Sequence, residues 1–277
     1  MRKLILGIDP SIQNIPDIYK RNQTVDIVSW GADLIEACKD KVAGVKFQIA
    51  YFENLGLDGL IALAQLIRIA KDHQLKTIMD AKRGDIGSTS AAYAQAYLSD
   101  ENAAGTNDFS CDYLTVNPLM GEDCLDPFVE MAVQNNKGIF VLLETSNPGA
   151  KMILKETLKN QSTVNSKIAS YISLTHKKLG IAGGAIGPIG CVVGATNQDG
   201  SHWREKLPNS LFLMPGIGAQ GGCLDVVKSC DSGAGVWVPI SRGITQSHHE
   251  PPSNKAYINA VKDNVSYYYK QLTSALI

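Results

Sequence analysis

Two acidic and two basic residues occur within six positions of the stretch DAKRGDIGST, residues 80–89. Asp80 and Lys82 stand at the end of a predicted strand, and Asp85 comes three positions after Lys82. Because alternate side chains of a strand face the same way, Asp80 and Lys82 are expected to share a face. Burying several charges is costly unless they pair with one another. The stretch therefore predicts either a structural ion-pair network or a site that uses a charged lysine.

Lys46 and Gln48 alternate in the same way on the preceding predicted strand, and on neighbouring strands Lys46 would approach Asp80 and Lys82. Opposite charges about 4 Å apart attract by roughly 4 kcal/mol at an effective dielectric constant near 20. The flanking carboxylates are therefore expected to keep Lys82 protonated. A protonated lysine in a dry pocket can stabilise a developing carbanion and then protonate it. The catalytic candidates are Lys82, Asp80, Asp85 and Lys46.

A second group of residues follows the last two predicted strands. The stretch PGIGAQGG at 215–222 is a glycine-rich turn, and SRG occupies 241–243. Loops after strands seven and eight of α/β barrels frequently hold phosphate with backbone N–H groups, and Arg242 could add a bidentate charged grip. Tight-turn geometry is the alternative explanation of the glycines alone. Glycines at both positions, with an arginine at the second, favour a phosphorylated substrate.

Eight short apolar runs alternate with helical or connecting segments along the chain. This alternation indicates a parallel sheet, and eight equal units favour an α/β fold, a (β/α)₈ TIM barrel that forms a single domain over residues 1–277. An open doubly wound sheet is the alternative, weakened because no GxGxxG follows the first run. Ser88 is the expected N-cap of the helix at 88–100. The runs are 4–9, 44–50, 76–82, 113–118, 138–146, 189–196, 211–218 and 235–241.

Composition excludes several classes of function. The 277 residues carry a formal net charge of −1 and are 44% hydrophobic, so no broad basic field exists for nucleic acid or an anionic membrane. The apolar run before Asp9 is too short for a signal peptide or a membrane span. The six cysteines form no CxxC pair and have no histidine at zinc spacing. We therefore expect a cytoplasmic protein with reduced thiols and no metal site.

Seven stretches taken together resemble the orotidine 5′-phosphate decarboxylase family, most closely its longer bacterial and protozoan branch. Sister barrels that act on sugar phosphates share the Asp-x-Lys-x-x-Asp core, whereas its combination with the later motifs is specific. The resemblance implies a TIM barrel that decarboxylates orotidine 5′-phosphate to uridine 5′-phosphate, the last step of de novo UMP biosynthesis, without metal or organic cofactor. The stretches are DAKRGDIGST, GVKFQIAYFE, LTVNP, TSNPGA, VVGAT, MPGIGAQGG and SRGI.

The resemblance also implies roles for individual residues. Lys46, Asp80, Lys82 and Asp85 would form an alternating charged network in a homodimer with shared active sites. Asp85 and Thr89 would reach into the neighbouring subunit's site. The other implied substrate-binding residues are Asp9, with Lys46, at the ribose hydroxyls; Thr145 and Ser146 at the pyrimidine edge; and Pro215, Gln220 and Arg242 over the base and phosphate. Two further substrate-binding candidates are Asn117, at the end of a predicted strand, and Gly218, in the glycine-rich turn.

Two other functions fit parts of the sequence. A sister decarboxylase or aldolase for a keto-sugar phosphate would use Asp-x-Lys-x-x-Asp to hold Mg²⁺, and loss of activity with a chelator would identify it. A catalytically inactive barrel that serves as a scaffold would have a damaged constellation, whereas every charged member is present here. The resemblance gives Gln48 no clear role, and Ser241 stands where many relatives have glycine.

Overall fold

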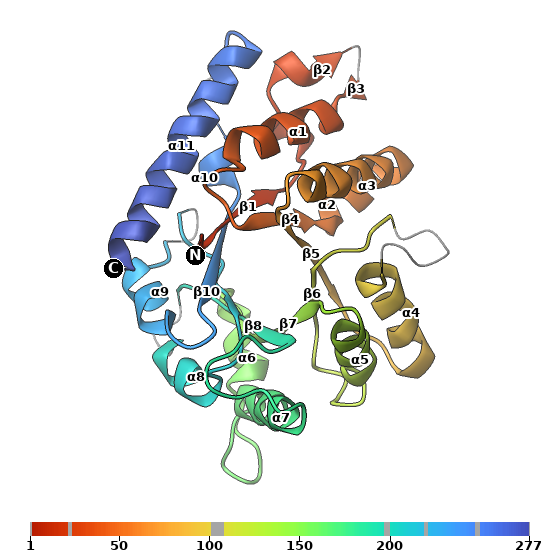
Figure 1. Ribbon diagram of the computed structural model, residues 1–277, viewed down its shortest axis with the longest axis vertical. Coiled ribbons are helices and arrows are strands. Elements are labelled where there is room, and N and C mark those ends of the chain that lie inside the picture. Colours follow the sequence, from red (N-terminus) through yellow and green to blue (C-terminus); the bar gives the residue numbers. More distant parts are fainter. Residues whose placement is uncertain are drawn as a thin grey trace. The chain divides into compact units, whose positions relative to one another are not determined.

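The computed structural model describes residues 2–21, 24–100, 108–196, 200–218, 221–246 and 250–276. Its eight parallel strands close into a barrel in the order β1-β10-β9-β8-β7-β6-β5-β4. Helices connect the strands, which confirms the predicted TIM barrel (Figure 1). Each strand overlaps one of the eight predicted apolar runs. The strands are β1 Leu4–Ile8, β4 Gly44–Gln48, β5 Lys76–Arg83, β6 Tyr113–Val116, β7 Gly138–Glu144, β8 Ile189–Val193, β9 Phe212–Leu213 and β10 Val236–Ile240.

Contacts between Cα atoms group the chain into two compact units. The first combines Met1–Ala81 with Pro239–Ala275, and the second is Lys82–Val238. The boundaries between the units fall inside strands β5 and β10. The expectation of one domain over residues 1–277 stays a prediction.

In the first unit, β4 pairs in parallel with β1 and with β5, so that Lys46 lies opposite Gly7 and Ile78. The residues of β1 are all buried, as expected of a strand covered on both faces. Helix α11 lies beside α1 (Figure 1), and Trp30 Nε1 donates a 2.8 Å hydrogen bond to Tyr257 Oη between them. The helices are α1 Ile27–Cys38, α2 Ile49–Glu53, α3 Gly56–Asp72, α10 Arg242–Thr245 and α11 Asn254–Ala275, with 3₁₀ turns η1 Ile12–Asn14 and η2 Asp17–Tyr19.

The first unit also contains a small antiparallel pair, β2 Lys20–Arg21 with β3 Thr24–Val25. This pair was not predicted, because strands of two residues are too short to show a hydrophobic period. It lies between β1 and α1 in the chain and adds no strand to the barrel.

In the second unit, aromatic rings fill the space between strands. Tyr113 stacks on Phe140 with centroids 5.0 Å apart and meets Trp237 edge-on at 5.1 Å. Helices α4 and α5 pack against each other (Figure 1). The helices are α4 Gly87–Leu98, α5 Asp126–Gln134, α6 Lys151–Leu154, α7 Val164–Lys178, α8 Gly200–Lys206 and α9 Leu224–Cys230, with a 3₁₀ turn η3 Pro148–Ala150.

Helix α4 is capped two residues earlier than the sequence predicts. Its N-cap is Ile86, with no side-chain capping bond, so the expectation that Ser88 is the N-cap is wrong. The chain already turns before Ser88, because Asp85 Oδ1 accepts a hydrogen bond from Ile86 N and Ser90 Oγ donates to the Asp85 carbonyl. Gly87 takes the first helical position with a φ of +47°, which glycine adopts without a steric penalty.

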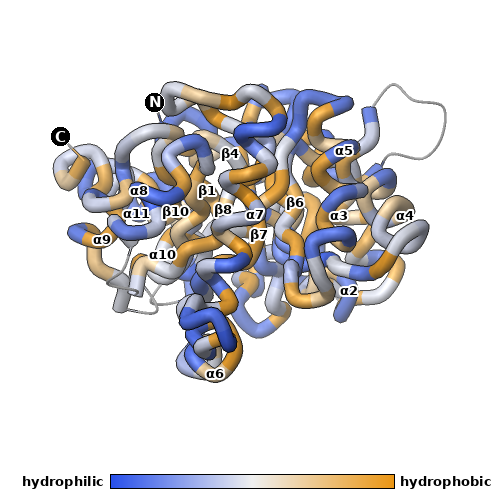
Figure 2. The backbone as a smooth tube through the Cα atoms, turned by 90° about the horizontal axis from the view of Figure 1, so that it is seen from below, coloured by the Kyte–Doolittle hydropathy of each residue, from blue (hydrophilic) through white to orange (hydrophobic). Residues whose placement is uncertain are grey.

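Hydrophilic and hydrophobic residues occur side by side along helices such as α3, as Figure 2 shows. The buried residues of α3 recur at helical spacing, and its remaining residues are half-buried or exposed. Within the described ranges, no helix has both the length and the apolar character that crossing a membrane requires.

Candidate active site

A lysine and an aspartate, both buried, face each other from neighbouring strands. Lys46 on β4 and Asp80 on β5 are each 8% exposed, and Lys46 Nζ lies 3.0 Å from Asp80 Oδ2. Gln48, two positions after Lys46, donates its Nε2 hydrogen to the same Oδ2, also at 3.0 Å. Two predicted catalytic residues are therefore in contact, and Gln48 holds the shared carboxylate from the same side of β4.

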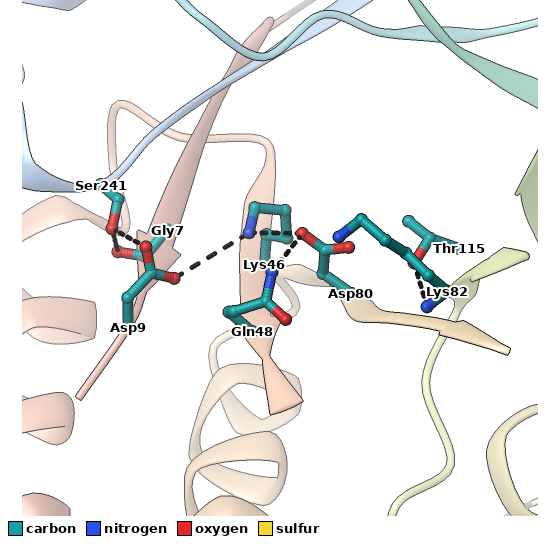
Figure 3. Close-up of polar contacts among 8 residues, drawn as sticks. All are labelled: Gly7, Asp9, Lys46, Gln48, Asp80, Lys82, Thr115 and Ser241. Carbon is teal, nitrogen blue, oxygen red and sulfur yellow. Dashed lines mark hydrogen bonds and ion pairs between the residues drawn. The ribbon is translucent and has the colours of Figure 1, made fainter. Parts of the chain in front are cut away.

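Asp9 extends this group from the end of β1 (Figure 3). Its Oδ1 lies 3.9 Å from Lys46 Nζ, and its Oδ2 accepts a 2.6 Å hydrogen bond from Ser241 Oγ. Asp9 Oδ1 is buried and has no hydrogen-bond partner among the residues that the structure describes. Asp9, Lys46 and Asp80 thus form a line in which one cation stands between two carboxylates.

The charge of Lys46 follows from these neighbours. Burial by itself lowers the pKa of an ammonium, because a dry environment disfavours the charged form. The carboxylates of Asp80 and Asp9 outweigh this effect, so the pKa of Lys46 lies above its usual value. Lys46 is therefore a fixed cation at neutral pH and cannot act as a general base there.

Lys82 stands two residues after Asp80 on β5, and its backbone is unusual. Its φ is +49°, in the left-handed region, which a residue with a side chain seldom adopts. Its backbone N–H donates a 2.9 Å hydrogen bond to Thr115 Oγ1 of β6 (Figure 3). The side chain is exposed. The backbone of β5 therefore departs from regular strand geometry at Lys82, next to a hydrogen bond to β6.

Asp85 and Thr89 lie beyond the end of β5. Asp85 is in the connection to α4, where its Oδ1 accepts a 2.8 Å hydrogen bond from the backbone N–H of Ile86. Thr89 lies in the first turn of α4 and is exposed. The two residues that are predicted to reach into a neighbouring subunit's site therefore lie close together in the chain, at the start of α4.

The ends of β6 and β7 carry three more candidates. Asn117 follows β6, and its Oδ1 accepts a 3.0 Å hydrogen bond from Leu119 N. Thr145 and Ser146 follow β7, and both are half-buried. Glu144, directly before them, is 2% exposed, forms a 2.7 Å ion pair with Lys155 and accepts a hydrogen bond from Trp203 Nε1. This buried carboxylate anchors the chain that carries Thr145 and Ser146.

The glycine-rich turn begins directly after β9. Pro215 is half-buried and its carbonyl accepts a 2.9 Å hydrogen bond from Ala195 N. Gly216 and Gly218 have φ values of +115° and +87°, so the turn requires residues without a Cβ at both positions. Gln220, a predicted substrate-binding residue, lies outside the described residues.

Arg242 is the first residue of α10 and is exposed. Helix α10 is held against α11, because Tyr257 Oη donates to the Thr245 carbonyl at 2.7 Å and Asn264 Nδ2 donates to the Ile244 carbonyl at 3.2 Å. Arg242 therefore extends from a turn that is fixed on the side of α11.

The contacts in the first unit bring together Asp9, Lys46 and Asp80, and the other candidates lie at or beyond the ends of β5, β6, β7, β9 and β10. Sequence reasoning missed the contacts of Gln48, Ser241 and Thr115. The position of Gln48 on the Lys46 face was a usable signal, whereas nothing in the sequence links Ser241 to Asp9. Among the residues that the structure describes, no cluster of three or more His, Cys, Asp or Glu side chains could hold a metal ion.

Comparison with known proteins identifies the family. The model of the "Orotidine 5'-phosphate decarboxylase / HUMPS family" matches residues 2–256. The chain belongs to this family. A relative from Rhodopirellula baltica named orotidine 5′-phosphate decarboxylase is 37% identical over 254 residues, which cover 88% of this chain and 83% of the relative. A relative of the same name from Clostridium tetani is 36% identical over 267 residues, 94% of this chain and 89% of the relative.

Solved structures agree with the family. The crystal structure of a Streptomyces avermitilis protein, 30% identical, has a TM-score of 0.84 and covers 99% of this chain and 92% of its own. The OMP decarboxylase of Leishmania donovani, 25% identical, has a TM-score of 0.73 and covers 99% of this chain and 94% of its own. The barrel of this chain is therefore that of the orotidine 5′-phosphate decarboxylase family.

Proposed function

We propose that this chain decarboxylates orotidine 5′-phosphate to uridine 5′-phosphate and CO₂, the last step of de novo UMP biosynthesis, and needs no metal or organic cofactor. Family membership over residues 2–256 and relatives named for this activity support the proposal. The observation that carries it is the buried Lys46 between the carboxylates of Asp9 and Asp80. These residues lie toward the carboxyl ends of β1, β4 and β5, where TIM barrels build their active sites.

Asp9 and Lys46 are proposed to bind the ribose. Asp9 Oδ1 is a buried acceptor without a hydrogen-bond partner in the described part of the chain, and such an atom costs about 1–3 kcal/mol. A ribose hydroxyl that donates to Oδ1 would remove this cost. The Lys46 ammonium, 3.9 Å from the same oxygen, would supply a hydrogen bond to the other face of the hydroxyl.

Lys82 is proposed to carry the chemical step. The bond between C6 of the pyrimidine and the carboxylate carbon breaks, its electron pair stays on C6, and CO₂ leaves. The ammonium of Lys82 stabilises the resulting carbanion and gives its proton to C6; the neutral amine then regains a proton from water. Asp80 and Asp85 are proposed to keep Lys82 cationic. The left-handed backbone at Lys82 supports this role, because such strain concentrates at functional sites.

The remaining candidates are proposed to hold the two ends of the nucleotide. Thr145 and Ser146, anchored by the buried Glu144, would meet the pyrimidine edge. The residues proposed for the base and phosphate are Pro215, Gln220 and Arg242, and Asn117 and Gly218 are proposed as further substrate-binding residues. The phosphate would act through binding energy remote from the reacting bond, which an enzyme can use to position that bond.

We also propose a cytoplasmic homodimer in which Asp85 and Thr89 complete the partner's site. Mixing Asp85→Ala with Lys82→Ala subunits tests the sharing, because only the mixed dimer contains one site with an intact Lys82 and an intact Asp85. Partial recovery of turnover is expected in mixed dimers verified by mass. An absence of recovery would show that each chain uses its own Asp85.

The decisive experiment incubates purified, chelator-treated protein with orotidine 5′-phosphate and follows the loss of the substrate's ultraviolet absorbance. We expect turnover that added Mg²⁺ leaves unchanged, with uridine 5′-phosphate as product. No turnover of this nucleotide, together with Mg²⁺-dependent turnover of a keto-sugar phosphate, would overturn the proposal in favour of the sister activity.

A further inference from the structure

Ser241 stands between two parts of the proposed site. It is the last residue before α10, directly preceding Arg242, and its side chain points toward the end of β1 (Figure 3). Its Oγ donates a 2.6 Å hydrogen bond to Asp9 Oδ2 and lies 3.2 Å from the Gly7 carbonyl. A hydroxyl carries one hydrogen, and the shorter contact to the charged acceptor is the stronger bond.

The fit between Ser241 and β1 is close. A Cβ added to Gly7 would lie 2.8 Å from Ser241 Cβ and 3.1 Å from its Oγ. Gly7 therefore leaves the space that the serine side chain occupies, and the hydroxyl reaches Asp9 two positions further along the chain. The serine is packed in place and is not a mobile surface side chain.

The turn that carries Ser241 is also fixed from behind. Tyr257 and Asn264 of α11 donate hydrogen bonds to the carbonyls of Thr245 and Ile244. A Cβ on Gly243 would overlap the hydroxyl of Tyr268, so this residue too is closely covered. With the turn held against α11, the position of Ser241 fixes the Asp9 carboxylate it bonds.

Asp9 in turn faces the charged line. Ser241 occupies Oδ2, so the rotation of the carboxylate is fixed, and Oδ1 is directed toward Lys46 at 3.9 Å without a hydrogen bond of its own among the described residues. Lys46 continues the line to Asp80 at 3.0 Å. Through Asp9, the hydroxyl of Ser241 thus links the turn that carries Arg242 to the buried cation Lys46.

We propose that Ser241 is a positioning residue that aligns Asp9 Oδ1 for the ribose hydroxyl. Through Asp9 it also couples the turn at 241–243, which carries the proposed phosphate ligand Arg242, to Lys46. This inference rests on the proposed function. Its hydroxyl is engaged with Asp9, so Ser241 acts through the carboxylate and leaves the phosphate to Arg242 and backbone N–H groups. Removing the hydroxyl frees the carboxylate to rotate without removing any group that contacts the phosphate.

The test is a double-mutant cycle on Ser241→Ala and Asp9→Asn, with orotidine 5′-phosphate as substrate and inorganic phosphate as competitive inhibitor. Ser241→Ala is expected to lower kcat/KM by about ten-fold or more, because hydrogen bonds to charged groups are among the stronger ones. In the Asp9→Asn background the same change should have less than a two-fold effect. The inhibition constant of phosphate should change by less than about two-fold.

Two further variants keep the test decisive. Ser29→Ala is the matched control, because Ser29 Oγ also donates to an aspartate, Asp26, at 2.8 Å on the exposed start of α1; its kcat/KM should equal that of the unaltered protein. Ser241→Gly replaces Ser241→Ala if the alanine variant does not fold, since it only removes atoms next to Gly7.

The results separate the two proposals. If the unaltered protein does not turn over the nucleotide, the proposed function is wrong. If it does, three results overturn the role of Ser241. These are unchanged kcat/KM in Ser241→Ala, equal losses in both Asp9 backgrounds, or phosphate binding weakened as much as kcat/KM, which would make Ser241 a phosphate ligand.

Discussion

Two buried cations in this molecule are stabilised in opposite ways. Lys46 lies two residues before the carboxyl end of β4 and is paired with the carboxylates of Asp80 and Asp9. Arg204 of α8 is 4% exposed, and its guanidinium lies 3.8 Å from the ring centroid of Phe212. It donates to backbone carbonyls at 2.8–2.9 Å, those of Cys230, Leu207, Ser210 and Gly235.

The two regions differ in whether a buried polar atom near the cation lacks a hydrogen-bond partner. The guanidinium of Arg204 donates hydrogen bonds to carbonyls of the segments that precede β9 and β10. These hydrogen bonds form within the chain and need no ligand. The line around Lys46 contains Asp9 Oδ1, a buried acceptor without a partner in the described ranges. In TIM barrels the catalytic residues lie at the carboxyl ends of the strands, whereas residues at the amino ends contribute to stability. We therefore expect substitutions in the two regions to separate activity from stability.

Lys82→Ala should have the largest effect, on the side of activity. Loss of the proton donor and of the charge that meets the carbanion should lower kcat by about 10⁴-fold or more, while uridine 5′-phosphate still binds. Initial rates and calorimetry measure both quantities. Lys228→Ala, a change of an exposed lysine on α9, is the control. Near-normal turnover of Lys82→Ala would refute its assignment.

Arg204→Met should show the reverse pattern. It keeps much of the volume but removes four buried hydrogen bonds, those to the carbonyls of Cys230, Leu207, Ser210 and Gly235, which should cost about 3–5 kcal/mol of the free energy of unfolding. Urea denaturation measures this loss, and kcat of the folded enzyme should stay within about two-fold. A stability equal to that of the unaltered protein would show that water replaces the guanidinium, and a large loss of kcat would contradict the separation of the two regions.

His176 should give a smaller effect that depends on pH. It is 3% exposed, its Nε2 accepts a hydrogen bond from Ile189 N at the start of β8, and burial lowers its pKa to about 4. The unfolded chain, with a histidine pKa near 6.5, binds the proton first. Stability is therefore fully present above about pH 6.5 and falls by about 3 kcal/mol as the pH drops toward 4.

Urea denaturation between pH 4 and 7 of His176→Gln measures this contribution. The fall in stability should be less steep in His176→Gln than in the unaltered protein. His202→Gln, which changes an exposed histidine of α8, should leave the slope unchanged. Identical slopes for all three proteins would show that His176 is not a source of the pH dependence.

The barrel could be predicted from the sequence because its strands are short apolar runs with polar residues at one end. The contact of Lys46 with Asp80 was predictable for the same reason, since alternation puts both on one face. The positive φ of Lys82 could not be predicted in this way, because nothing in the spacing of the residues marks it. The role of each predicted site residue stays a prediction.

Other contacts had no sequence signal. Arg204 stands in the polar stretch SHWREK, which is typical of an exposed helix, and its acceptors are backbone carbonyls that any residue could supply. The bond from Ser241 to Asp9 joins residues 232 positions apart. The contacts of Arg204 and Ser241 form only when distant segments of the chain pack together, and local propensity does not predict such packing.

The central claim is that the charges around Lys46 are kept for chemistry and not for stability. The double variant Lys46→Met/Asp80→Leu tests it directly, because apolar residues of similar volume can replace a buried ion pair at no cost or with a gain. We predict a free energy of unfolding within about 1 kcal/mol of the unaltered protein, or above it, and no detectable decarboxylation. A loss of several kcal/mol, or retained turnover, would contradict the claim.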